Sequence, residues 1–444
     1  MANTQLRRTN GTPTNAYKGT FSAWIKRGSL SNQRTFMNMV DGNNYCWLAF
    51  NASHQLEVVG LVSGSTYCDY KTNRLFRDTN AYYHIMVVID TTEGTATNRM
   101  KLYVNGVQET SFATHTFNGG QSSNHPLLIA STTNYHTVGA SEANTLNFDG
   151  LMSHVHFCDG TALAPTVFGS TDSTTGEWKI NTSPSFTLGN NGYSILKDGN
   201  TITDQSANSN DFTVGSGTLT KTEDNPSNVF CTLNPLMQNM SGYFSGNVTS
   251  LVFGNGNTYA GKVTHGTYFG TIGVSSGKYY WEVKLEDTNN AFGIMAMKPN
   301  GGVSLAYDDA TSQLYYPYSD YYYINGSNGS SGSGDFDNTA NKIYSFALDA
   351  TNNKMWIGRD GTFVGDPANG TGATWSSLPT GHDWTPVCHP MATTQNNNTW
   401  FNFGNGYFGT TAVSSAGTNA SGNGIFEYNV PTGFTALSTK GLNL

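Results

Sequence analysis

The chain has 444 residues, and only 12% of them are Asp, Glu, Lys or Arg, about half the share usual in soluble proteins. Glycine (50 residues), small polar residues and a 13% aromatic content predominate instead, which predicts an all-β protein with many short strands and excludes a disordered chain. The net charge is −8 and the basic residues are scattered along the sequence, which argues against nucleic-acid binding. No apolar run approaches the roughly 18 residues of a membrane span.

The N-terminal half contains several segments with the pattern of β-strands. They are residues 20–26, 82–90, 100–110, 127–130 and 147–157. Residues 82–90 (YYHIMVVID) are apolar on both faces, which predicts a central strand. Asn105-Gly106 separates two strand-like runs and predicts a tight hairpin turn.

The C-terminal half centres on residues 276–284 (SGKYYWEVK), where a glycine turn leads into a run of aromatic and β-branched residues. Tyr279, Trp281 and Val283 share one face of this predicted strand, which we expect to enter a core. The alternate residues, with Glu282 among them, are expected to meet water. Further strands are predicted at residues 291–297, 342–348, 354–358, 385–388 and 400–403.

The order of these motifs resembles two known families. The N-terminal strands, followed by residues 159–169 (DGTALAPTVFG) and 175–179 (TGEWK), resemble laminin-G-like jelly rolls of a subgroup found in tailed bacteriophages. The motifs at 279–283, 349–361 and 402–404 (NFG) are similar in order to those of SPRY domains. The resemblance spans nearly the whole chain. It implies two tandem concanavalin-like antiparallel β-sandwiches (jelly rolls) in a structural protein of a phage particle.

Residues 224–236 (DNPSNVFCTLNPL) hold two prolines and few residues that continue a strand ladder, as in an ordered linker. Phe230 and Leu233 are expected to attach this linker to a neighbouring domain. The expected division is a laminin-G-like jelly-roll domain at 1–221, a linker at 222–240, a SPRY-like sandwich at 241–412, and a C-terminal segment at 413–444 that packs on the second sandwich.

Paired carboxylates are the first test for an enzyme, because glycosidases place two of them about 5–9.5 Å apart. The best pair on one strand face is Glu282 and Glu286, which lie roughly 13 Å apart on a flat strand. That distance is too long, so we expect both to be solvent-facing strand carboxylates and expect no catalytic residues. Walker loops, GxGxxG after a strand and G-x-S-x-G elbows are also absent from the sequence.

Metal binding has weak support in the sequence. His154 and His156 are two apart on a predicted strand and share a face, yet no nearby cluster supplies the further ligands that a metal site needs. A structural or surface role is therefore favoured for both histidines. Acidic residues that offer oxygen ligands for calcium are Asp308, Asp309, Asp335 and Asp337. Their spacing does not fit a calcium loop of the EF-hand type, so we expect no cofactor, with calcium as the alternative left open.

The five cysteines lie far apart in sequence, which is typical of small buried residues rather than of a disulfide framework. Whether Cys46 pairs with Cys68 is left open by the sequence.

The most suggestive stretch for binding is residues 314–333, where six tyrosines precede a Gly/Ser/Asn-rich loop. A tyrosine ring offers a flat apolar face and a hydroxyl, which suit a sugar or a protein surface. The alternative is that alternate tyrosines pack into the sheet and the glycine-rich part is a solvated loop. The candidate ligand-binding residues are Tyr315, Tyr316, Tyr318, Asp320, Tyr321, Tyr322, Tyr323 and Asn325.

Together, the residues and the resemblance lead to the expectation of a non-catalytic virion protein, an appendage or fibre component that recognises a host surface glycan or receptor. Its other expected partners are further virion proteins and copies of itself, without nucleic acid or membrane insertion. The N-terminus shows no apolar secretory core, so we expect synthesis in the host cytoplasm and location in the virion. A purely architectural capsid-decoration or tail-connector protein and a polysaccharide-degrading enzyme are the alternatives.

Overall fold

The chain divides into two compact units, residues 1–221 and 222–444, in the computed structural model. The structure describes residues 4–28, 30, 33–124, 135–197, 202–237, 251–261, 266–297, 306, 309–331, 336–391 and 398–443. Nearly all regular structure in these residues is β-strand, which confirms the all-β prediction. The helices of the described residues are single 3₁₀ turns: η1 (Ala96–Asn98), η2 (Pro165–Val167), η3 (Pro235–Met237), η5 (Pro317–Ser319) and η6 (Gly441–Asn443).

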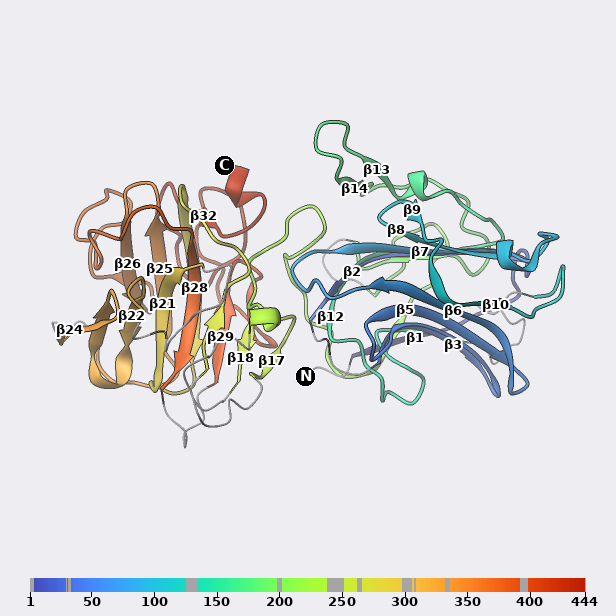
Figure 1. Cartoon of the computed structure of the whole chain (residues 1–444), viewed down its shortest axis with the longest axis horizontal. Helices are drawn as coiled ribbons and strands as arrows, with labels where there is room; N and C mark the ends of the chain where they lie inside the picture. The colour runs from blue at the N-terminus through green and yellow to red at the C-terminus, as the bar shows by residue number, and fades with distance from the viewer. Residues whose placement is uncertain are drawn as a thin grey trace. The chain divides into compact units, whose positions relative to one another are not determined.

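The first unit is built from two antiparallel sheets that Figure 1 shows as separate layers. One sheet has the order β10 (Phe112–Phe117), β6 (Ser65–Leu75), β5 (Gln55–Val62), β4 (Asn44–Phe50), β3 (Arg34–Asp41), β11 (Tyr135–Val138), β1 (Gln5–Thr9), β16 (Thr213–Ser216). The other has the order β15 (Tyr193–Ile195), β12 (Gly150–Asp159), β2 (Lys18–Arg27), β7 (Tyr83–Asp90), β8 (Met100–Val104), β9 (Val107–Gln108). A separate hairpin pairs β13 (Gly169–Thr171) with β14 (Trp178–Ile180).

The core of the first unit lies between its two sheets. Phe21 and Val87 come from one sheet, Leu48 and Val58 come from the other, and all four belong to one buried cluster. The strands predicted at residues 20–26 and 82–90 are confirmed as the paired strands β2 and β7.

The hairpin turn predicted at Asn105-Gly106 is confirmed, since it joins β8 to β9. Both residues have positive φ, 48° and 77°, as such a turn requires. The strand predicted at residues 127–130 lies outside the described residues.

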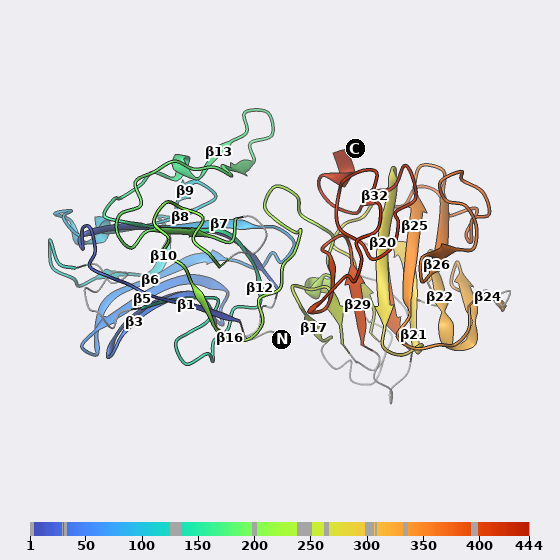
Figure 2. The same ribbon diagram turned by 180° about the vertical axis from the view of Figure 1, so that it is seen from behind.

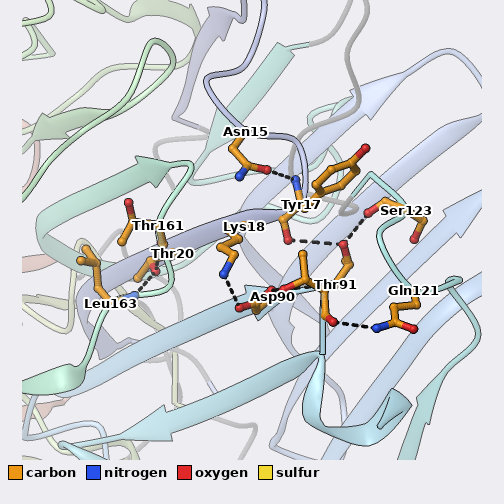
Figure 3. A network of polar contacts seen from close by, with 11 residues as sticks. Asn15, Tyr17, Lys18, Thr20, Asp90, Thr91, Gln121, Ser123, Thr161 and Leu163 are labelled. Carbon is orange, nitrogen blue, oxygen red and sulfur yellow. Dashed lines mark hydrogen bonds and ion pairs between the residues drawn. The ribbon is translucent and has the colours of Figure 1, made fainter. Parts of the chain in front are cut away.

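A polar network ties the start of β2 and the end of β7 to nearby loops (Figure 3). Lys18 forms an ion pair with Asp90 at 2.9 Å across the two strands. Thr91 is buried and held by two hydrogen bonds. Its N–H donates to the Tyr17 carbonyl at 2.9 Å, and its hydroxyl donates to the Ser123 carbonyl at 2.6 Å. The network therefore fixes two loops to the edge of the β-sandwich.

The second unit repeats the two-sheet plan with different strand lengths. Its larger sheet has the order β17 (Phe253–Gly254), β18 (Tyr259–Ala260), β29 (Thr399–Asn402), β20 (Lys278–Leu285), β25 (Ile343–Asp349), β26 (Lys354–Arg359), β27 (Thr362–Phe363), with β32 (Thr435–Ala436) parallel to β20. The other sheet has the order β19 (Tyr268–Phe269), β28 (Trp384–Pro390), β21 (Asn290–Ala296), β22 (Gln313–Tyr316), β23 (Tyr321–Ile324), β24 (Ser327–Ser331). A small hairpin pairs β30 (Tyr407–Phe408) with β31 (Thr411–Ala412).

Strand β20 lies at the centre of the larger sheet, between β29 and β25 (Figure 2). Trp281 and Val283 are fully buried in the core, as predicted. The prediction that the other face meets water is wrong, because Tyr280 and Glu282 are also fully buried. The C-terminal segment covers this face: the Phe426 ring packs edge-on against Tyr280, with 4.8 Å between ring centroids.

The proline-containing stretch at residues 222–237, predicted as linker, packs as part of the second unit. Phe230 and Leu233 are buried in its core, and the Cys231 N–H donates to the Leu437 carbonyl at 2.8 Å. This stretch has poor strand propensity, but it is ordered because its apolar side chains are buried in a core. Residues 238–240 lie outside the described residues.

Candidate ligand-binding surface

The tyrosine-rich stretch forms a hairpin at the edge of the smaller sheet of the second unit. Strands β22 and β23 pair antiparallel, with Tyr315 opposite Tyr322 and Tyr316 opposite Tyr321, and η5 makes the turn between them. Successive side chains in a strand point to opposite faces, so the run of tyrosines is divided between two environments.

The prediction of ligand contact is wrong for three of the tyrosines, because their side chains are buried. Tyr315 is fully buried and Tyr322 is 8% exposed, and both pack in the main core of the second unit. Tyr323 is 7% exposed and packs in a second apolar cluster with Leu314. The alternative that alternate tyrosines pack into the sheet is therefore confirmed for Tyr315 and Tyr322, whereas the adjacent Tyr323 is buried on the other face.

The exposed tyrosines gather at the turn. Tyr318 is 52% exposed and Tyr321 is 37% exposed, and the half-buried Tyr316 lies beside them, with 5.9 Å between the Tyr316 and Tyr318 ring centroids. These three residues are called the tyrosine patch below. The structure shows no hydrogen bond from the Tyr318 hydroxyl to any described residue, so this group is available to a ligand.

Hydrogen bonds to neighbouring residues hold the backbone of the turn in place. Asp320 ends η5 in the left-handed conformation, with φ of 51°, and its Oδ1 accepts a hydrogen bond from the buried Tyr315 hydroxyl at 3.1 Å. The Tyr318 N–H donates to the Thr288 carbonyl at 3.2 Å, and the Tyr318 carbonyl accepts from Asn338 Nδ2 at 3.2 Å. The exposed rings therefore belong to a turn whose backbone is held by hydrogen bonds.

Polar groups border the tyrosine patch on the loop between β20 and β21. The Tyr316 hydroxyl donates to Asn289 Oδ1 at 3.2 Å, and Asn289 Nδ2 donates to Asp287 Oδ1 at 3.2 Å. Burial, with a smaller effect of the neighbouring Tyr323 and Tyr318, raises the pKa of Tyr316 to about 12. The hydroxyl is thus a hydrogen-bond donor at all physiological pH values.

The two polar candidates of the stretch have different surroundings. Asp320 is half-buried and bonded to the Tyr315 hydroxyl. Asn325 is exposed, and it forms with Gly326 the two central residues of the turn between β23 and β24, both with positive φ. Asn325 Oδ1 accepts from Gln313 Nε2 at 2.6 Å, so its amide oxygen stabilises the hairpin. The residues after this turn, predicted as a solvated loop, form the edge strand β24, which is a correction to the sequence-based prediction.

Glu282 is enclosed by hydrogen-bond donors. Its Oε1 accepts from the Tyr280 hydroxyl and the Tyr428 N–H, each at 2.9 Å, and its Oε2 accepts from Asn402 Nδ2 at 3.0 Å and the Glu427 N–H at 2.9 Å. Burial raises the pKa of Glu282 to about 7, and these donors act in the opposite direction. The prediction of an exposed carboxylate is wrong, and the side chain joins β20 to the C-terminal segment.

The two predicted histidines are buried in the first unit. A bulge in β12, with φ of 49° at His154, brings the His154 and His156 rings to 6.2 Å between centroids. His156 Nδ1 lies 2.8 Å from the Ser194 hydroxyl, and burial lowers the pKa of His156 well below its usual value. Both are structural residues, which agrees with the favoured reading of the sequence.

Of the predicted calcium ligands, Asp309 and Asp337 are described and are engaged elsewhere. Asp309 Oδ1 accepts from the Thr311 N–H at 2.9 Å within a turn, and Asp337 forms an ion pair with Arg359 at 2.5 Å. Asp308 and Asp335 lie outside the described residues. Over the described ranges, no three His, Cys, Asp or Glu side chains come together as a metal-binding group.

All five cysteines are buried free thiols. Cys46 and Cys68 both lie opposite Gly60, on the strands to either side of β5. Two strand spacings separate their Cα atoms by about 9.6 Å, beyond the roughly 7 Å that a disulfide spans. A hydrogen bond to the Cys68 thiol and burial together raise the pKa of Cys46 well above its usual value.

Comparison with known proteins bears on the first unit. Residues 2–168 match the family described as Concanavalin A-like lectin/glucanases superfamily, which supports the jelly-roll architecture predicted for this unit. No curated protein sequence matches the chain. In the part of the chain that the structure covers, no helix is long and apolar enough to cross a lipid bilayer.

Several solved structures are similar to parts of the chain. The SPRY domain of human HERC1 is 15% identical over 38% of this chain and 96% of that chain, with a TM-score of 0.29. A heptameric SAP-like pentraxin from Limulus polyphemus is 17% identical over 36% of this chain and 71% of that chain, with a TM-score of 0.28. A protein from Bacteroides ovatus described as carbohydrate binding is 15% identical over 49% of this chain and 60% of that chain, with a TM-score of 0.31. No functional conclusion follows from likenesses at these TM-scores.

Proposed function

We propose that this chain is a non-catalytic recognition protein whose tyrosine patch binds a glycan on a cell surface. The observation that carries the proposal is the pair of exposed rings, Tyr318 and Tyr321, on a turn that is held by hydrogen bonds. Rigid aromatic rings bind at a low cost in conformational entropy, and a sugar ring stacks on a flat apolar face while its hydroxyls reach polar neighbours. The half-buried Asp320 is such a neighbour.

The family matched by residues 2–168 contains lectins as well as glucanases by its description, so carbohydrate recognition is compatible with the fold of the first unit. A non-catalytic role is proposed because Glu282, the best candidate acid of the sequence, has both carboxylate oxygens occupied by protein donors. No cofactor enters the proposal.

The setting we propose is the virion of a tailed phage, in which the second unit has SPRY architecture and the chain is one of several copies in an appendage or fibre. The motif order of the sequence supports this setting. Each tyrosine patch would bind a glycan weakly, and several copies of the chain in one particle would raise the overall avidity. A map of an intact particle with the chain located in its appendage tests this part of the proposal, and location in the capsid shell would contradict it.

Replacement of Tyr318 by Ala tests the binding proposal directly. The full chain and the variant are compared on a glycan array and in adsorption to host cells. We expect affinity to fall about tenfold, which is about 1.4 kcal/mol, because a stacking surface is removed. The matched control is Tyr17→Ala, which removes a tyrosine of similar exposure (39%) from the first unit.

Thermal unfolding of the same variants separates binding from folding. Tyr318→Ala should leave the melting temperature nearly unchanged, whereas Tyr322→Ala should cost about 3 kcal/mol because it opens a cavity in the core. Unchanged glycan binding by Tyr318→Ala, or equal loss in the Tyr17→Ala control, would reject the tyrosine patch. Turnover of the polysaccharide would instead revive the enzyme alternative.

A further inference from the structure

Two aromatic side chains lie next to each other on the outer face of the larger sheet of the second unit. Tyr259 on β18 is the strand partner of Trp400 on β29, and 6.0 Å separate their ring centroids. Both side chains point away from the core, because the next residues in sequence, Ala260 and Phe401, are buried in it. Tyr259 and Trp400 are half-buried, so both remain partly accessible to a ligand.

The C-terminal segment covers one part of this sheet face and leaves the aromatic pair outside. On β20 the outward side chains Tyr280 and Glu282 are fully buried, and this segment packs on them. The next outward side chains, Lys284 and Glu286, are only half-buried. Lys284 is also a strand partner of Trp400, so the accessible part of the face begins at this row.

Hydrogen bonds hold a carboxylate beside the aromatic pair. The Tyr259 hydroxyl donates to Asn398 Oδ1 at 2.5 Å, and Asn398 Nδ2 donates to Glu286 Oε2 at 2.5 Å. The Glu286 N–H donates to the Asn398 carbonyl at 3.0 Å, which continues the ladder between β20 and β29 by one residue. Burial, with a smaller effect of the Glu286 charge, raises the pKa of Tyr259, so its hydroxyl stays protonated as a donor.

Polar groups around the aromatic pair have hydrogen-bonding capacity to spare. Among the described residues, Trp400 Nε1 donates no hydrogen bond, Glu286 Oε1 accepts none, and Lys284 forms no ion pair. Protein atoms do not enclose Trp400 Nε1 or Glu286 Oε1 either. The loop beside the indole passes it at Gly409, where a Cβ atom would lie 2.9 Å from Trp400 Nε1. A side chain at this position would crowd the indole N–H, so the glycine leaves this donor open.

We propose that the tryptophan platform, defined as Tyr259, Lys284, Glu286 and Trp400, binds a neutral sugar residue of a glycan. The C–H face of a sugar ring stacks on flat aromatic rings, here those of Tyr259 and Trp400. The sugar hydroxyls then bond to the free groups around the rings. They donate to the Glu286 carboxylate and accept from the Lys284 ammonium and from the indole N–H.

The charges of the tryptophan platform favour a neutral ligand. Lys284 supplies a positive charge and Glu286 a negative one, two positions apart on the same side of the strand, so their fields largely cancel for an approaching ion. An anionic sugar would meet the Glu286 carboxylate, which Asn398 holds in place. A sugar hydroxyl both donates and accepts, so it matches such a mixed set of groups.

The tryptophan platform shares no residue with the tyrosine patch. The platform lies on the larger sheet of the second unit, whereas the patch belongs to the smaller sheet. The inference therefore adds a second glycan-binding site to the proposed function and does not rest on it. Each of the two sites can fail in an experiment without the other.

The first experiment uses the full chain with Tyr318→Ala, in which the tyrosine patch is weakened. A glycan array presents neutral oligosaccharides of glucose, galactose and mannose beside the corresponding uronic acid oligosaccharides. We expect at least one neutral oligosaccharide to bind, and its uronic acid counterpart to bind more weakly. If Tyr318→Ala binds no neutral oligosaccharide, or binds the uronic acids more tightly, the proposal is wrong.

The deciding variants are Trp400→Ala and Glu286→Gln in the same background, measured by calorimetry with the neutral oligosaccharide that binds best. We expect each variant to lower the affinity about tenfold, because one removes the stacking surface and the other the charged acceptor. The matched control is Trp47→Ala, at a half-buried tryptophan on β4 of the first unit. It should bind as the background chain does, and an equal loss in this control would overturn the assignment.

Thermal unfolding of the same variants separates loss of binding from loss of folding. Glu286→Gln keeps a side-chain oxygen for the Asn398 donor, so its melting temperature should be unchanged. Weaker binding by this variant at an unchanged melting temperature supports the platform even where Trp400→Ala unfolds. Full affinity of Glu286→Gln would contradict the proposed contact between its carboxylate and the sugar.

Discussion

Glu282 shows how one side chain can connect two distant segments. Its carboxylate, on the central strand β20, accepts hydrogen bonds from the backbone N–H groups of Glu427 and Tyr428, which are 145 and 146 residues away in sequence. A buried carboxylate without partners is costly, and the donors supplied by the C-terminal segment and by Asn402 offset much of that cost. Glu282 is thus a structural residue of the second unit.

The pH dependence of stability tests this role. Burial raises the pKa of Glu282 from its ordinary value near 4.5 to about 7 in the folded protein. Between these values the unfolded chain has lost this proton and the folded chain retains it, so we expect the free energy of unfolding to fall as pH rises from about 4.5 to 7. The loss from this group amounts to about 3 kcal/mol at most.

Chemical unfolding at a series of pH values compares the parent chain with Glu282→Gln, which cannot ionise. The difference in unfolding free energy between the two proteins should shift in favour of the variant as pH rises through this window. A difference that is constant with pH would show that the carboxylate keeps its ordinary pKa.

At the scale of elements, the ends of β2 and β7 are fixed by side chains as well as by the strand ladder (Figure 3). The Thr91 hydroxyl is the central donor, because it bonds to the Ser123 carbonyl at 2.6 Å and approaches the Tyr17 carbonyl at 3.4 Å. Thr20 does the same for another loop: its hydroxyl donates to the Thr161 carbonyl at 2.9 Å and accepts from the Leu163 N–H at 3.0 Å.

Thr91→Val keeps the shape of the side chain and removes the hydroxyl. We expect it to lower the free energy of unfolding of the first unit by about 1 kcal/mol, because the partly buried Ser123 carbonyl loses its donor. Denaturant titration followed by far-UV circular dichroism measures the change. The control is Thr175→Val, at an exposed threonine. An equal effect at both positions would contradict the assigned role of Thr91.

The pairing of β22 with β23 explains which tyrosines of the stretch are buried and which are exposed. Pairing in the β22–β23 hairpin directs Tyr315 and Tyr322 into the core, and η5 places Tyr318 at the turn, outside the strand alternation. The period of two in the sequence predicts that the tyrosines divide between faces. It does not predict that a second apolar cluster covers the other face and buries Tyr323 there as well.

For the whole molecule, each unit has a main core of its own, one with Phe21 and Leu48 and the other with Trp281 and Phe346. The buried thiols are divided in the same way: Cys46, Cys68 and Cys158 belong to the first unit, and Cys231 and Cys388 to the second. The thiols therefore report on the unfolding of each unit.

We expect no thiol to react with an alkylating reagent in the native protein, since all five are buried. Pulsed alkylation during denaturant unfolding, read by mass spectrometry, should show labels added in groups of three and two as each unit unfolds. Simultaneous labelling of all five thiols would show that the units unfold as one. Labelling in the native protein would contradict the buried placement.

The sequence by itself determined the all-β class, the main strands and several turns, because these depend on neighbours along the chain. The alternation in β2, the apolar run of β7 and the Asn105-Gly106 turn are local patterns of side-chain size and backbone freedom. For the tyrosine stretch, the sequence predicted either a binding surface or alternate tyrosines packed into a sheet, and the hairpin was seen only in the structure.

Only the tertiary structure decided which polar groups are buried and which charges meet. Glu282 is enclosed because a segment 145 residues away covers β20. Arg27 reaches the Phe76 carbonyl because the sandwich brings these two segments together. Burial and electrostatic contact depend on distance in space, which a single sequence does not contain. The exposed tyrosine patch is therefore a product of the fold, although every residue in it is visible in the sequence.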